Sequence, residues 1–130
     1  MIKELKRKEN GQAIVEMALV LPIFLLLLFG IFEMSIIGYT YISLNNAARA
    51  GARVASVGGS DLDITTTIQN AVVLNNSSLT INITPPENQR QSGQDVTVNV
   101  SYPVQIIVPL LGGILPNPYI VNADLTMRIE

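Results

Sequence analysis

The stretch MALVLPIFLLLLFGIF, from Met17 to Phe32, decides the architecture of this 130-residue chain. Its sixteen residues carry no charge, and Glu33 is followed by further apolar residues up to Ile37. The whole stretch has about the 20 residues that an α-helix needs to cross the hydrocarbon core of a bilayer. A chain of this size cannot enclose such a helix on all sides. A membrane-spanning helix is therefore predicted over residues 12–37, with Glu33 at the outer edge of the span.

A cleaved secretory signal peptide is the nearest alternative explanation for an apolar stretch close to an N-terminus. The nearest suitable small-residue motif is Ala48-Arg49-Ala50, far beyond the apolar stretch. Signal peptidase cuts near the end of the apolar region, so the motif is badly placed for conventional cleavage. The helix, which is expected to begin at about Ala13, is therefore expected to act as an anchor.

Charge is distributed unevenly along the chain, whose formal net charge is −2. Four basic residues and two acidic residues give the first eleven positions a net charge of +2, and the remainder carries −4. The basic residues are Lys3, Lys6, Arg7 and Lys8. Basic residues beside a membrane span stay in the cytoplasm. The chain is therefore predicted to cross the cytoplasmic (inner) membrane once, with its N-terminus inside and its C-terminal domain outside.

Composition argues against two classes of function. The acidic balance offers no basic surface for nucleic acid, so no nucleic-acid partner is expected. The chain has no cysteine and no histidine, and no nucleophile motif or cluster of carboxylates replaces them. No enzymatic activity, catalytic residue, metal or cofactor is therefore predicted. Asp61 and Asp63 leave a cation site open, although helix capping explains both.

The junction between the basic leader and the apolar helix holds Gly11, Gln12 and, four residues later, Glu16. The arrangement resembles the processing site of type IV prepilins and pseudopilins, a class in which a membrane peptidase cuts after the glycine. The resemblance fits the chemistry of these residues, since glycine resists helix formation and a protease binds extended backbone. A cut after Gly11 would leave an ammonium group on Gln12, one helical turn from Glu16. A carboxylate buried among packed helices needs such a cationic partner.

A wider stretch resembles the TadE-like family, which comprises pseudopilins or minor pilins of the Tad (tight adherence, Flp-type) pilus. The similarity is carried by GQAIVEMALVLP at residues 11–22, the aliphatic residues after it, and NNAARAGAR at residues 45–53. It covers residues 10–57 well and the C-terminal part more loosely. Met17 departs from the pattern, since an aromatic residue often follows the glutamate.

The resemblance implies a role in pilus assembly. A prepilin peptidase would remove the leader, residues 1–11, and Glu16 would pair with the N-terminal amine of a neighbouring subunit. The implied partners are this peptidase, other Tad pilins and pseudopilins, the inner-membrane assembly platform and membrane lipid. Whether the chain enters an extracellular fibre, primes it or regulates it stays open. The alternative is an unprocessed single-pass adhesion or binding module.

Pro22 lies inside the predicted span and has no N–H for the carbonyl of Ala18, which predicts a kink. A tolerated transmembrane proline and a functional soft point both fit. The helix is expected to continue outside the membrane over residues 38–57 and to end at Gly58-Gly59. Small residues from Ala47 to Ala55 permit close packing against the chain's own sheet or against partner helices.

Residues 58–130 are predicted to form a small α+β domain. The long helix and this domain together give a pilin-like α+β architecture. Ser60 and Asp63 form a capping box for a second helix that reaches about Leu74. Alternating apolar residues indicate three strands, at residues 79–84, 96–102 and 119–130. An antiparallel sheet packed on the long helix follows from this alternation. The apolar segment Ile106–Leu115, too short to span a membrane, either covers the sheet or offers a surface to a partner.

Overall fold

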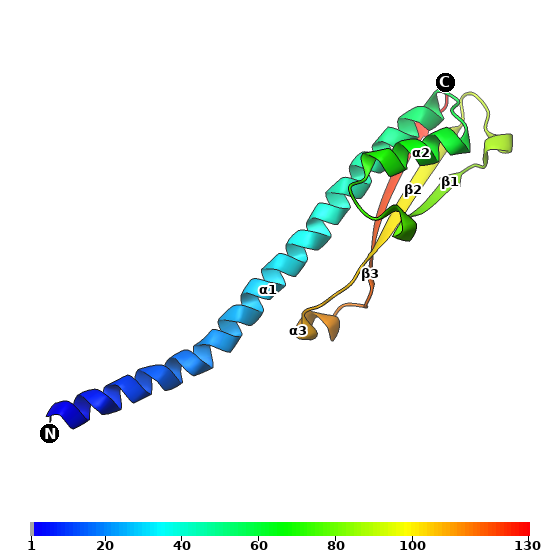
Figure 1. The fold of residues 1–130 in the computed structure, drawn as a ribbon. Coiled ribbons are helices and arrows are strands. Elements are labelled where there is room, and N and C mark those ends of the chain that lie inside the picture. Colours follow the sequence, from blue (N-terminus) through cyan, green and yellow to red (C-terminus); the bar gives the residue numbers. More distant parts are fainter. Residues whose placement is uncertain (1) are drawn as a thin grey trace.

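The computed structural model describes residues 2–130, and it describes side-chain surroundings from Gly11 onward. The basic side chains of the leader, on which the predicted orientation depends, lie outside the described part. A long helix, α1 (Ile2–Ser56), carries a small domain at its C-terminal end (Figure 1). The domain consists of α2 (Asp61–Ala71), β1 (Thr80–Thr84), β2 (Asp95–Val104), α3 (Pro109–Gly112) and β3 (Tyr119–Arg128), with short 3-10 turns η1 (Asn76–Ser78) and η2 (Glu87–Gln89). The predicted α+β class is confirmed.

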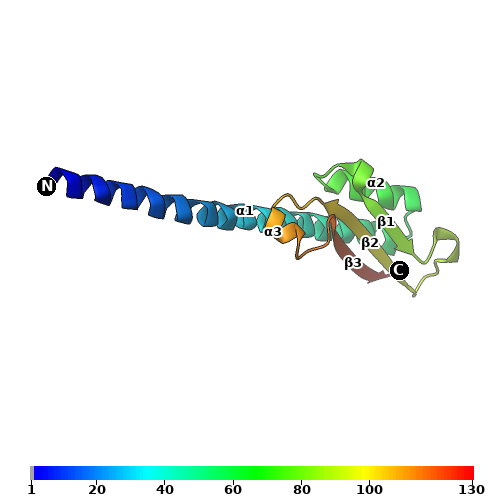
Figure 2. The same ribbon diagram turned by 90° about the horizontal axis from the view of Figure 1, so that it is seen from below.

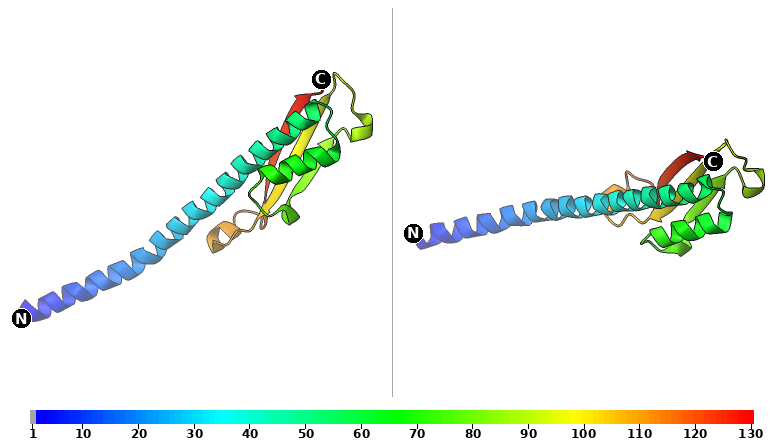
Figure 3. Two further views of the ribbon diagram at one scale, coloured as in Figure 1. Left: turned by 45° about the horizontal axis from the view of Figure 1, so that its top comes forward. Right: turned by 90° about the horizontal axis from the view of Figure 1, so that it is seen from above.

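Helix α1 begins at Ile2, so the prediction that it starts near Ala13 is wrong and Gly11 lies within the helix. The leader is rich in Lys, Glu, Leu and Arg, which favour helix, and one interior glycine costs only about 1 kcal/mol relative to alanine. The helix also continues through Pro22. Figures 1 and 3 show that α1 is bent rather than straight. The backbone hydrogen bond that Pro22 cannot make is a physical cause of such a bend.

A double glycine ends α1, as predicted. Gly58 adopts a positive φ of 80°, which glycine reaches without strain. Its N–H donates to the carbonyl of Ala55 at 3.1 Å, and the Gly59 N–H donates to the carbonyl of Val54 at 2.9 Å. Together these bonds satisfy the last carbonyls of the helix in a Schellman motif. The chain therefore reverses here, and α2 returns along α1.

The predicted capping box opens α2. The Ser60 hydroxyl accepts a hydrogen bond from the Asp63 N–H at 3.1 Å, and the Ser60 N–H donates to the Asp63 carboxylate at 3.3 Å. The helix ends at Ala71 instead of near Leu74, because Val72 adopts an extended conformation that β-branched residues favour. Ile64 and Ile68 are fully buried on the side that faces α1.

Three antiparallel strands form one sheet, as predicted, and their order in the sheet is β1-β2-β3. Val98 of the central strand lies opposite Ile83 of β1 and Leu125 of β3. Helices α1 and α2 cover one face of this sheet (Figure 2). The core between the two layers is formed mainly by Leu44, Ala47, Ala48, Ala52, Ala55, Ile64, Ile68, Val96, Val98, Val100, Val121 and Ala123.

The small residues of α1 pack against the chain's own domain. Ala47, Ala48, Ala52 and Ala55 are each at most 1% exposed. Gly51 approaches α2 so closely that an added Cβ atom would lie 2.6 Å from two side-chain atoms of Ile68. Of the two uses predicted for these residues, the structure therefore shows packing within the chain.

Candidate functional site

Helix α1 is exposed over residues 11–27, which we call the bare half. Every side chain from Gly11 to Leu27 is exposed, including Ile14 at 70% and Ile23 at 71%. The segment Gly11–Ser56 is long and apolar enough to cross a membrane, with a mean hydropathy of 2.7 in an 18-residue window none of which is buried within the chain. Water-soluble surfaces rarely expose apolar patches of this size. The bare half is therefore a candidate membrane anchor.

Gly11, Gln12 and Glu16 lie on consecutive turns at the start of this bare half. The Gln12 side-chain amide donates to Oε1 of Glu16 at 3.1 Å, so the two residues meet as their spacing predicts. Space beside Gly11 is open, with nothing within 4 Å of an added Cβ atom. Among the side chains described from Gly11 onward, Glu16 forms no ion pair. Its carboxylate is thus available to a cation from elsewhere.

Glu33 makes a contact that its sequence position alone does not predict. Its side chain is on the same helix but only 4% exposed. Oε1 accepts a hydrogen bond from the Ile107 N–H at 3.2 Å, and Oε2 accepts one from the Val108 N–H at 3.3 Å. A carboxylate in an apolar helix signals that a partner is needed. The sequence does not show which group is the partner. The partners are backbone N–H groups more than 70 residues away, and every residue type except proline supplies such a group.

The apolar segment Ile106–Leu115 lies beside α1 instead of over the sheet, so the predicted cover is wrong (Figure 1). Ile106 and Val108 are buried, whereas Ile107 is 80% and Ile114 is 77% exposed. The Asn117 side chain fixes the base of the segment by bonding both the N–H and the carbonyl of Ile106, each at 3.1 Å. The second expectation, an exposed apolar surface, is what the structure shows.

An open apolar groove of about 550 Å³ separates this segment from α1. Its walls are Pro22, Leu25, Leu26, Phe29, Phe32 and Ile36 on one side and Ile107 to Pro109 on the other. Glu33 contributes the one charged side chain among these lining residues. The groove therefore continues the apolar surface of the bare half of α1.

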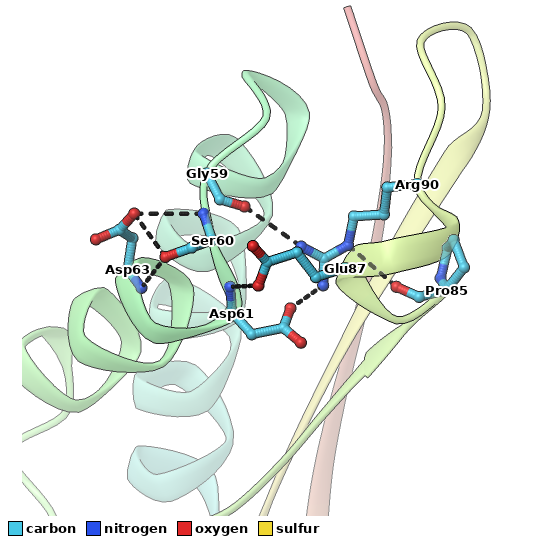
Figure 4. A network of polar contacts seen from close by, with 7 residues as sticks. All are labelled: Gly59, Ser60, Asp61, Asp63, Pro85, Glu87 and Arg90. Atoms are coloured by element: carbon cyan, nitrogen blue, oxygen red, sulfur yellow. Dashed lines mark hydrogen bonds and ion pairs between the residues drawn. The ribbon is translucent and has the colours of Figure 1, made fainter.

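Asp61 and Asp63 both have partners within the chain (Figure 4). Asp63 closes the capping box, and Asp61 forms an ion pair with Arg90. The Arg90 side chain, only 6% exposed, also donates to the carbonyl of Pro85 at 3.0 Å and to that of Gly59 at 3.3 Å. In the part of the chain that the structure describes, no group of three or more acidic, cysteine or histidine side chains forms a metal site. These aspartates hold the α1–α2 corner.

Replacing Arg90 by lysine should weaken this corner. Lysine keeps the charge toward Asp61 but cannot reach Gly59 and Pro85 with the fork of a guanidinium. Two hydrogen bonds to partly buried carbonyls are then lost, and we expect the free energy of unfolding to fall by about 1–2 kcal/mol. Denaturant titration of the detergent-solubilised chain measures the change. The exposed Arg49, replaced by lysine, is the matched control, and equal stability of the two variants would contradict the prediction.

Comparison with known protein families identifies the same region as the sequence motifs. Residues 11–53 match the family of TadE-like proteins. The TadE-like match confirms the resemblance and indicates a Tad-pilus-associated, pilin-like protein. It covers about a third of the chain, including the bare half of α1 and most of the buried small residues. Comparison with curated proteins and with solved structures gives no match.

Proposed function

We propose that this chain is a minor pilin or pseudopilin that takes part in assembling a Tad (Flp-type) pilus. The TadE-like match carries the proposal, because it begins at Gly11 and runs along the exposed part of α1. A long apolar helix with a small α+β domain at its end supports it. The bare half of α1 suits a helix that lies first in lipid and then among other helices. The role is structural, not catalytic.

Cleavage after Gly11 by a prepilin peptidase is part of this proposal. Removal of residues 1–11 gives Gln12 a free ammonium group, in a chain whose Glu16 already contacts Gln12. Gly11 lies in a helix, so the peptidase must unwind the chain locally. Unwinding is easiest at a glycine, the residue with the lowest helix propensity after proline. The proposed topology places the leader in the cytoplasm and the domain outside, with the pilus assembly platform and other Tad pilins as partners.

The Gly11→Leu variant should remain uncut in cells that contain the peptidase, because a branched side chain fills the open space at the cleavage site and strengthens the helix. The unmodified chain should begin at Gln12 in the same cells and at Met1 in cells without the peptidase. N-terminal sequencing and intact mass measurement distinguish the two forms.

Gly38→Leu is the matched control, since Gly38 is also exposed on α1 with nothing within 4 Å of an added Cβ atom. It should be cut like the unmodified chain. An unmodified chain that starts at Met1 despite the peptidase would contradict the processing proposal and favour an unprocessed, membrane-anchored adhesion or binding module.

A further inference from the structure

The segment Ile106–Leu115 is apolar and uncharged, and it belongs to a longer region, residues 96–123, that contains no charged residue. Ile107, Leu110 and Ile114 point into solvent within the isolated chain and are 80%, 54% and 77% exposed. Three large apolar side chains exposed on one short loop form a surface of the kind that marks an interaction site. The surroundings of the loop indicate what this surface contacts.

The two hydrogen bonds to Glu33 fix the loop beside the most apolar part of α1. On one side of the loop, Ile107 to Pro109 share a groove with Leu26, Phe29 and Phe32. On its other side, Leu111 lines a shallow groove with Leu27, Gly30, Ile31 and Met34. The loop is thus held level with residues of the candidate membrane span. Its exposed side chains continue the surface that α1 presents to lipid.

The backbone of the loop is adapted to low polarity. Unpaired N–H and C=O groups are costly in a bilayer, so irregular segments there must satisfy them internally. Within residues 106–115, Pro109 has no N–H to satisfy. Acceptors within the chain are present for the N–H groups of Ile106, Ile107, Val108, Gly112, Gly113, Ile114 and Leu115. In a loop that only contacts water, these N–H groups could bond to water and would not need acceptors within the chain.

We propose that residues 106–115 are a second membrane contact, which enters the interfacial part of the bilayer leaflet nearest the folded domain. A lipid acyl chain fills the apolar groove between the loop and α1. Glu33, shielded from lipid by the loop, fixes the depth at which the loop lies. The domain is thereby held against the membrane at two points instead of swinging on a single helix. This inference depends on the proposal that α1 spans the bilayer. The experiment below tests the membrane anchor and the loop contact separately.

Because the chain has no cysteine, single cysteines can carry a fluorescent probe at chosen positions. The full-length chain is labelled with a nitrobenzoxadiazole dye at Leu110→Cys, at Leu27→Cys in the span, or at Ser92→Cys in the exposed turn before β2. Each is reconstituted as one copy per nanodisc of phosphatidylcholine, with or without bromine at positions along the acyl chains. Bromine quenches only probes that contact lipid. We expect quenching at Leu110 to approach that at Leu27 and to exceed that at Ser92 several-fold.

Quenching at Leu110 no greater than at Ser92, with Leu27 quenched, would overturn the loop contact and leave the anchor intact. Absence of quenching at Leu27 as well would overturn both the anchor and the loop contact. If the Leu110 probe is shielded from water only in nanodiscs that hold several copies, the proposal would also be overturned, in favour of contact with a second copy of the chain.

Replacing Glu33 by alanine tests the depth-setting contact. The variant should lower quenching at Leu110 several-fold and leave quenching at Leu27 unchanged, because the two backbone N–H groups lose their acceptor. Ser35→Ala is the control, since Ser35 is exposed and its hydroxyl donates to the Ile31 carbonyl of its own helix. Unchanged quenching at Leu110 in the Glu33→Ala variant would show that Glu33 does not set the depth of the loop.

Discussion

Replacing Glu16 by alanine should reduce pilus assembly by about a hundredfold or more, since removing one partner of a buried ion pair costs roughly 3–5 kcal/mol. In the uncut chain this carboxylate is exposed and accepts a hydrogen bond from the Gln12 amide. After the proposed cleavage, a neighbour's ammonium group at Gln12 would be its partner in a packed helix bundle. Loss of the carboxylate leaves that ammonium buried and unpaired. Pilus yield on cells that depend on the variant measures the effect.

Cleavage and folding should be unaffected by this replacement, because Glu16 lies in the exposed stretch of α1, residues 11–27, away from the buried core of the domain. Met17→Ala is the matched control: Met17 is the next residue, is 65% exposed and carries no charge. Glu16→Gln should resemble alanine, not the unmodified chain, if charge is what matters. A normal pilus yield with Glu16→Ala would contradict the proposed role of this residue.

Much of the fold follows from local patterns in the sequence. The apolar stretch Met17–Phe32 predicts the exposed helix, and the double glycine at residues 58 and 59 predicts its end. Alternation in strands such as Val96 to Val100 predicts which face of the sheet is buried, because successive side chains point to opposite faces. In each case the residues whose pattern predicts an element are the same residues that form that element.

Contacts between distant segments were not predictable in the same way. Glu33 reaches Ile107 and Val108, and Arg90 reaches Gly59, because the assembled domain brings these segments together. Their acceptors and donors are mostly backbone groups, which any residue type supplies. The start of α1 was mispredicted for a different reason: the penalty for Gly11 in a helix is too small to end a helix that both flanks favour.

Replacing Gly51 by alanine should destabilise the domain by about 1–3 kcal/mol, although alanine is the better helix former. The added Cβ atom would lie 2.6 Å from Cδ1 and Cγ1 of Ile68 and 3.4 Å from Ile64. Ile68 is fully buried, so it cannot move aside into solvent. The helices must therefore separate, and the core between α1 and α2 loses packing.

The sign of the stability change in Gly51→Ala shows whether packing against α2 or helix propensity dominates at this position. Gly38→Ala makes the same chemical change on the same helix, at an exposed position with nothing within 4 Å. There only propensity acts, and stability should rise by up to about 1 kcal/mol. Thermal unfolding in detergent, followed by near-ultraviolet circular dichroism of the tyrosines, should show shifts in opposite directions, of about 4–8 °C per kcal/mol. Shifts of the same sign would mean that the close approach at Gly51 does not limit the packing of α1 on α2.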